Sequence, residues 1–179
     1  MVYMFLAEGF EEIEALCPLD LLRRAGVDVK TVGIGSKTVC GAHGISVLAD
    51  MCEDEMNSFD ADMIILPGGM PGTLNLDASE CVHKAIDTAA QNGSYIAAIC
   101  AAPSILGKLG LLVGKEAICY PGFEDKLIGA KISDKRVVFD GKIITAAGMG
   151  VALEFGLVLV ELLCGKAKAQ ALRSGVIAD

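Results

Sequence analysis

The run from Tyr95 to Ile99, with the residues that follow it, constrains the fold of this chain more than any other stretch. It is short, nearly all apolar and preceded by a turn signal at 92–94, a composition typical of a strand buried on both faces. Pro103 and an apolar pattern with helical spacing come next, and proline is tolerated in the first turn of a helix. Cys100 is therefore predicted at the turn from a buried strand into a helix, at the sheet edge where open α/β folds bind ligands.

Strand and helix patterns alternate along the whole chain. We expect apolar strands over 2–6, 29–34, 62–66, 95–99 and 116–120, and helices over 11–24, 79–90, 103–109, 151–164 and 166–173. Two further pairs of short strands form hairpins, a small excursion over 38–48 and a second hairpin over 136–146. The alternation predicts an α/β fold with a doubly wound, mainly parallel sheet and helices on both faces. The pattern shows no linker or repeat, so we expect a single domain over 1–179.

Charge and cysteine usage narrow the classes of function. The chain has 15 basic and 23 acidic residues, a net charge of −8, which argues against a nucleic-acid partner. It lacks an apolar run long enough for a membrane span, and its start reaches an acidic residue too early for a signal peptide. Seven cysteines, an odd number without a CxxC pair, are typical of free thiols in a reducing cytoplasm. With only two histidines, no metal site is expected.

Cys100 has two interpretations at this point. Free cysteine usually acts as a small buried hydrophobe. A strand-to-helix turn instead resembles the nucleophile elbow of hydrolases, and the adjacent helix start favours a thiolate. The small residues Gly68 and Gly69 end another predicted strand, and they face Cys100 if the two strands are neighbours.

Several motifs in order resemble the DJ-1/ThiJ/PfpI superfamily, and within it the DJ-1 branch. They are LAEGFEEIE at 6–14, LPGG at 66–69, AAICAAP at 97–103 and GMG at 148–150, followed by matching segments at 154–156 and 162–166. The resemblance implies a flavodoxin-like fold and a homodimer, and the cysteine chemistry described below requires no cofactor.

The resemblance also implies the roles of individual residues. Cys100 corresponds to the family's reactive cysteine, and Glu14 to the acid whose side chain contacts that sulfur. The backbone N–H groups of Gly69 and Ala101, beside Gly68, correspond to an oxyanion-binding pair. Because two anions in contact repel each other, we expect a protonated Glu14 that donates a hydrogen bond to a Cys100 thiolate.

Two classes of function follow from this resemblance. The first is a cysteine-dependent enzyme for α-oxoaldehydes or glycated substrates, such as a glyoxalase III-like conversion of methylglyoxal to lactate or a deglycase reaction. The second is an oxidative-stress sensor or chaperone-like protein that acts through oxidation of Cys100 to the sulfinic acid, without turnover.

The sequence departs from the family pattern at two positions. Tyr120 stands where many relatives carry a histidine before a proline, so a Cys/His dyad and peptidase chemistry are not expected. His43 stands in the first hairpin, where relatives place an arginine near the partner subunit's cysteine. We expect His43 either to contribute to the pocket of the dimer partner or to be a solvated loop residue.

Overall fold

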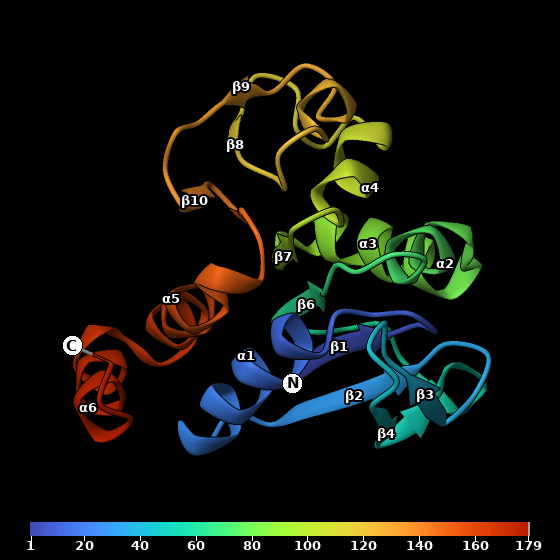
Figure 1. Ribbon diagram of the computed structural model, residues 1–179, viewed down its shortest axis with the longest axis horizontal. Helices are drawn as coiled ribbons and strands as arrows, with labels where there is room; N and C mark the ends of the chain where they lie inside the picture. The colour runs from blue at the N-terminus through green and yellow to red at the C-terminus, as the bar shows by residue number, and fades with distance from the viewer. Residues whose placement is uncertain (179) are drawn as a thin grey trace.

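The computed structural model describes residues 1–178 and confirms the α/β fold (Figure 1). Its helices are α1 (Glu12–Arg24), α2 (Gly72–Ala78), α3 (Glu80–Asn92), α4 (Pro103–Lys108), α5 (Ala152–Cys164) and α6 (Lys166–Gly175). Its strands are β1 (Val2–Leu6), β2 (Val29–Gly33), β3 (Thr38–Cys40), β4 (Ser46–Leu48), β5 (Met51–Cys52), β6 (Met63–Leu66), β7 (Tyr95–Ile99), β8 (Glu116–Ala117), β9 (Lys131–Ile132), β10 (Val137–Asp140) and β11 (Ile143–Ala146). Three single 3-10 turns complete the elements: η1 (Glu53–Glu55), η2 (Glu124–Lys126) and η3 (Met149–Val151).

The central sheet has the strand order β10-β11-β7-β6-β1-β2-β5. All its neighbouring strands run parallel except β10, which pairs antiparallel with β11 in the predicted second hairpin. The predicted excursion is also present, because β3 and β4 form a separate antiparallel pair. The doubly wound, mainly parallel sheet expected from the sequence is therefore confirmed.

Helices cover both faces of this sheet, and β1 shows how one strand serves two cores. Val2, Met4 and Leu6 belong to the core formed with α1, α5 and α6. Tyr3 and Phe5 point to the other face, into the core formed with α2, α3 and α4. Figure 1 shows these two groups of helices on opposite sides of the strands. An apolar strand without polar alternation is what burial on both faces requires.

Close packing of α1 on α5 depends on a glycine. A Cβ built at Gly156 would lie 2.6 Å from a methyl carbon of Leu21 and 3.0 Å from the Cα of Pro18. Pro18 lies inside α1, which nevertheless begins at Glu12, so the proline does not displace the helix start. The helix thus carries its first acidic residues directly to the end of β1.

Three local predictions need correction. The strand expected over 116–120 is only the two residues of β8, which pairs with β9 outside the central sheet. Helix α2 was not predicted, because the proline- and glycine-rich stretch before it hides its start. The apolar spacing of the helix expected over 79–90 places His83 on its other side and predicts an exposed residue, but His83 is half-buried and its Nε2 lies 2.7 Å from the carbonyl oxygen of Asp77.

Among residues 1–178, the helices are all too short or too polar to cross a lipid bilayer.

The sheet register sets the position of the candidate site. In the pairing of β6 with β7, Leu66 lies opposite Ala98. Gly68 lies two residues after Leu66, and Cys100 lies two residues after Ala98. Both therefore lie at the carboxyl edge of the sheet, at the ends of neighbouring strands. Strand β1 pairs with β6 on its other side, which brings the start of α1 to the same edge.

Candidate active site

Cys100 occupies a left-handed backbone conformation. Its φ is 65°, and it is one of two non-glycine residues with positive φ among those described. Such a conformation costs on the order of 1–3 kcal/mol and persists where the surroundings fix it. Two backbone hydrogen bonds do so here, because the Cys100 N–H donates to Ala146 O at 2.9 Å and Tyr120 N–H donates to Cys100 O at 2.8 Å. The sharp turn expected from the sequence is present.

Glu14 lies against this cysteine. Its side chain, on the first turn of α1, is hydrogen-bonded to the Cys100 side chain and only 1% exposed. Its Oε2 also accepts the Gly68 N–H at 3.0 Å. A Cβ at Gly68 would lie 2.6 Å from both Cys100 Cβ and Glu14 Oε2. The glycine is therefore required for the two side chains to approach each other.

Backbone N–H groups from two loops point at the sulfur. Gly69, after β6, and Ala101, after the elbow, both donate hydrogen bonds to the Cys100 sulfur. The N–H pair that the resemblance implies for oxyanion binding thus lies on the two sides of Cys100. The arrangement places hydrogen-bond donors where negative charge would develop during addition to a carbonyl.

Burial raises the pKa of both members of the pair. It raises the pKa of Glu14 to about 7, against the lowering effect of the hydrogen bonds from Cys100 and Gly68. Burial, together with the charge of Glu14 and its hydrogen bond, raises the pKa of Cys100 to about 12. The expected resting thiolate is therefore wrong. Near neutral pH the sulfur keeps its proton, and Glu14 is the member that titrates.

Known proteins resemble this chain over most of its length. The DJ-1/PfpI family matches residues 1–162. Protein dj-1beta of Drosophila melanogaster is 37% identical over 177 residues, covering 97% of this chain and 95% of the relative. The chain belongs to the DJ-1/PfpI family. Among other relatives, protein DJ-1 homolog B of Arabidopsis thaliana is 41% identical over 92% of this chain, which spans only 38% of that protein.

Other family members add a named activity and the same fold. One relative is named glutathione-independent glyoxalase DJR-1.2 of Caenorhabditis elegans. It is 34% identical to this chain, and the match covers 92% of this chain and 89% of the relative. A DJ-1 superfamily protein from Salmonella typhimurium superposes with a TM-score of 0.94 at 33% identity, covering 98% of this chain and 97% of that one. Crystalline Drosophila melanogaster DJ-1beta gives a TM-score of 0.93 at 36% identity, covering 98% and 96%.

Tyr120, at the position of the family histidine, lies beside the glycine loop that follows β11. A Cβ at Gly148 would lie 3.2 Å from Tyr120 Cδ2 and 3.9 Å from Glu14 Oε1. The tyrosine is half exposed, and its side chain is a phenol in place of an imidazole. It lies on the same side of the site as Glu14 and supplies no imidazole for a Cys/His dyad.

His43 lies at the acidic start of α1. Its Nδ1 lies 3.0 Å from Glu12 Oε2 and 3.6 Å from Glu11 Oε2. Burial would raise the pKa of Glu12, but hydrogen bonds from the side chain and backbone of His43 and the backbone of Ile45 outweigh it and lower that pKa to about 2. The hydrogen bond with Glu12 raises the pKa of His43.

The contacts of Glu12 account for this cluster without a metal. The ligand atoms of Glu11, Glu12 and His43 lie within 4.8 Å of one another, a spacing that could hold an ion. Both Glu12 oxygens already accept hydrogen bonds from the His43 segment, at 2.8 Å and 3.0 Å. Gly41 packs so closely that a Cβ there would lie 2.3 Å from Glu12 Oε1. The cluster fastens the β3–β4 hairpin to α1.

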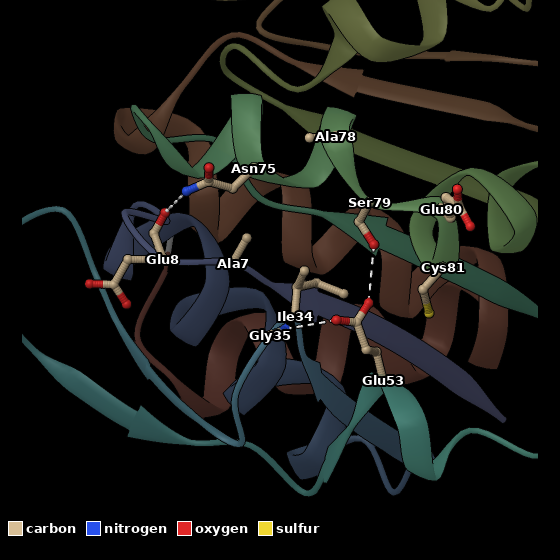
Figure 2. A pocket seen from close by; sticks show the side chains of 10 residues that line it. All are labelled: Ala7, Glu8, Ile34, Gly35, Glu53, Asn75, Ala78, Ser79, Glu80 and Cys81. Carbon is tan, nitrogen blue, oxygen red and sulfur yellow. Dashed lines mark hydrogen bonds between the residues drawn. The ribbon is translucent and has the colours of Figure 1, made fainter.

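The structure contains a pocket that the sequence did not predict (Figure 2). It has a volume of about 530 Å³ and opens at the carboxyl ends of β1 and β2, against the start of α3. Ala7, Ile34 and Ala78 form its apolar part. Glu53 crosses it, accepting the Gly35 N–H at 2.8 Å and the Ser79 hydroxyl at 3.2 Å. No single motif in the sequence unites these residues, because they come from four separate segments.

Proposed function

We propose that this chain is a cysteine-dependent enzyme without a cofactor that acts on small reactive carbonyls, with Cys100 as the nucleophile and Glu14 as the acid/base. One observation carries the proposal: the hydrogen bond between Glu14 and a Cys100 side chain held at a strained strand-to-helix turn. Family membership supports it, since one relative is named a glutathione-independent glyoxalase. The substrate class proposed is α-oxoaldehydes, with methylglyoxal converted to lactate, or related glycated compounds.

Addition to the aldehyde is the first step. Above about pH 7 the Glu14 carboxylate accepts the thiol proton while sulfur attacks, and a base whose pKa lies near the working pH is efficient. The new S–C bond forms as the C=O π bond breaks. The N–H groups of Gly69 and Ala101 stabilise the oxygen that becomes negative, which then takes up the proton to give a hemithioacetal.

Proton transfer between two carbons completes the conversion. Glu14 removes the proton from the hemithioacetal carbon and returns one to the neighbouring carbonyl carbon, while the hydroxyl proton on the first carbon passes to the oxygen of the second. The first carbon is thereby oxidised to a thioester and the second is reduced to an alcohol, so no external oxidant is needed. Water then cleaves the thioester, releases lactate and regenerates the Cys100 thiol.

Formation of a homodimer is part of the proposal. Ile13 on α1 and Ile45 and Leu48 near the β3–β4 hairpin are exposed apolar side chains, and the family resemblance implies an interface at these two elements. Burial of these side chains against a second copy would remove them from water. Sedimentation of the purified protein would measure the assembly, and a monomer at micromolar concentration would contradict it.

The decisive experiment measures lactate formed from methylglyoxal without glutathione. We expect turnover by the wild type, none by Cys100→Ala or Glu14→Gln, and unchanged turnover by the matched control Cys164→Ser, which alters an exposed cysteine. Absence of lactate from the wild type at about 1 mM substrate, the upper end of ordinary KM values, would refute the proposal. Full activity in Cys100→Ala would refute it equally.

Oxidation sensing is the second candidate function. Cys100 is partly exposed, and the donors around its sulfur would also hold a sulfinate oxygen. A similar structure is that of oxidized Toxoplasma gondii DJ-1, at a TM-score of 0.91, 35% identity and coverage of 98% and 97%. Under mild peroxide, mass spectrometry should find two added oxygens on Cys100 before the other cysteines react. Equal oxidation of all thiols would exclude this candidate.

A further inference from the structure

Residues 146–150 run from the end of β11 toward α5 and contact both members of the Glu14–Cys100 pair. The first of them, Ala146, accepts the Cys100 N–H at 2.9 Å. Two residues further on, a Cβ at Gly148 would lie only 3.9 Å from Glu14 Oε1. One short segment therefore lies against the proposed nucleophile and the proposed acid/base together.

Met149 makes the contact that bears on the proton of Glu14. Its backbone N–H is hydrogen-bonded to the Glu14 carboxyl group and favours the charged form. The Gly68 N–H reaches Oε2 of the same group at 3.0 Å, whereas Gly148 lies near Oε1. The carboxyl group is thus held between the loop after β6 and the loop after β11.

The 146–150 segment has few contacts of its own to fix its shape. Gly148 and Gly150 flank Met149, and glycine has the most backbone freedom to lose on folding. A Cβ at Gly150 would meet nothing within 4 Å, so this end of the segment is not packed against another element. The position of the Met149 N–H therefore depends on hydrogen bonds from outside the segment.

Arg136 supplies such hydrogen bonds at both ends. It directly precedes β10, and its carbonyl oxygen accepts the Ala147 N–H at 3.0 Å. Its Nη2 donates to Gly150 O at 3.0 Å, and its Nε lies 3.2 Å from Glu154 Oε2 in the first turn of α5. A guanidinium presents its donors in a rigid fork, so one side chain joins the segment to α5 in a defined geometry.

The charged and titratable side chains on the elements around Glu14 and this segment are those of Glu11, Cys100, Tyr120, Arg136 and Glu154. The charge of Glu11 raises the pKa of Glu14, and Cys100 lowers it through the hydrogen bond. Arg136 is exposed to solvent, where the charge of a side chain has little effect on its surroundings. Its route to Glu14 is therefore the backbone of the segment.

We propose that Arg136 is a positioning residue for Glu14, because its hydrogen bond to Gly150 O fixes the 146–150 segment against the carboxyl group. The proposal rests on the proposed role of Glu14 as acid/base. Loss of the Arg136 side chain would loosen the segment and weaken the backbone donation to the carboxylate. Glu14 would then keep its proton to a higher pH.

The test compares the wild type with Arg136→Met, which keeps an unbranched side chain but removes its donors. A ¹³C NMR titration of glutamate carboxyl carbons, assigned with Glu14→Gln, follows the Glu14 proton without substrate. We expect its midpoint, at about 7 in the wild type, to rise by at least about 0.5 pH unit. The kcat/KM for methylglyoxal should fall about threefold at pH 6 and match the wild type at pH 9.

Controls separate positioning from loss of charge. Arg24→Met removes an exposed, paired arginine from the helix that carries Glu14 and should leave the midpoint unchanged. Arg136→Lys keeps the charge and a single point donor, so its midpoint should rise less than that of Arg136→Met. In about 1 M salt, where charges are screened beyond about 3 Å, the shift in Arg136→Met should persist.

Three outcomes would overturn the proposal: an unchanged Glu14 midpoint in Arg136→Met, an equal shift in Arg24→Met, or a shift that salt abolishes. Absence of lactate from the wild type would instead refute the proposed function, and the NMR midpoints would still decide the role of Arg136. Circular dichroism checks that each variant is folded. If Arg136→Met does not fold, Arg136→Lys decides, and a midpoint equal to that of the wild type counts against the proposal.

Discussion

Glu14 and Cys100 are joined by a hydrogen bond at the carboxyl edge of the sheet, although one lies on the first helix and the other follows the fifth strand of the central sheet. Gly68 makes this contact possible, since any side chain there would occupy the space between them. The contact also determines how protons are distributed. Burial raises both pKa values, and the carboxyl group titrates first, at about 7.

The rate of carbonyl conversion should depend on the Glu14 proton. Because the carboxylate form accepts the thiol proton, kcat/KM should rise as pH increases through about 7 and then level off. Stopped assays of lactate from pH 5 to 9 measure this profile. Glu14→Gln, which has no titrating group at this position, should be nearly inactive, and its kcat/KM should not change with pH. A wild-type profile without an inflection would contradict the role of Glu14 as base.

The same group should make the stability of the protein change with pH in the opposite direction to the rate. The folded chain keeps the Glu14 proton to about pH 7, whereas the unfolded chain releases it near 4.5, so stability from this group falls as pH rises through that window. Glu14→Gln should therefore exceed the wild type in unfolding free energy by up to about 3 kcal/mol at pH 8. At pH 4 the unfolding free energies of the variant and the wild type should agree within about 1 kcal/mol. Urea unfolding at both pH values is the measurement, and a Gln variant less stable at pH 8 would contradict it.

Substitution of Gly68 should disrupt the site by crowding. In Gly68→Ala the new Cβ would lie 2.6 Å from Cys100 Cβ and from Glu14 Oε2, and overpacking of this kind costs about 1–3 kcal/mol. We expect loss of turnover and a lower urea midpoint. Gly150→Ala is the matched control, because a Cβ there meets nothing within 4 Å and its φ is not positive. Equal effects of the two substitutions would show that crowding is not the cause.

The backbone strain at Cys100 can be measured with two inactive variants. Cys100→Ala keeps a Cβ at φ 65°, whereas Cys100→Gly removes it from a conformation that glycine adopts freely. The Gly variant should be more stable than the Ala variant by about 1 kcal/mol. Urea unfolding under reducing conditions tests this difference, and a less stable Gly variant would show that the turn is not strained.

The hairpin contact should weaken in acid. Burial disfavours the Glu12 carboxylate, but hydrogen bonds from the His43 segment lower its pKa to about 2, so the stability it contributes is present above about pH 4.5 and is lost as pH falls toward 2. Hydrogen exchange of the His43 and Ile45 amides, which donate to Glu12, should accelerate in that window beyond the ordinary effect of pH. Glu12→Gln should lack this acid-dependent loosening. Exchange identical in the two proteins would contradict the assignment.

Some parts of this structure follow from local sequence alone. The apolar run at 95–99 predicts a strand buried on both faces, and Pro103 with the following pattern predicts a helix start. Burial and chain geometry impose these patterns locally, so Cys100 could be placed at its turn without coordinates. The motifs at 6–14 and 66–69 added Glu14 and the glycine loop by resemblance to a family.

Other parts could not be predicted from local patterns. Helix α2 begins after a proline and glycine stretch that reads as a loop, and β8 ends after two residues because it pairs only with β9. The pocket beside Glu53 combines segments that carry no shared motif.

The sequence by itself determined the alternating elements, the parallel sheet and the position of one cysteine at its carboxyl edge, because periodicity and turn residues act over a few positions. Only the tertiary structure decided the protonation of the pair, since desolvation depends on everything packed around Glu14 and Cys100. A helix start alone favours a thiolate, but burial beside a carboxyl group keeps the proton on sulfur. That balance depends on the residues that pack around the pair in the folded protein, and no single segment of the sequence predicts it.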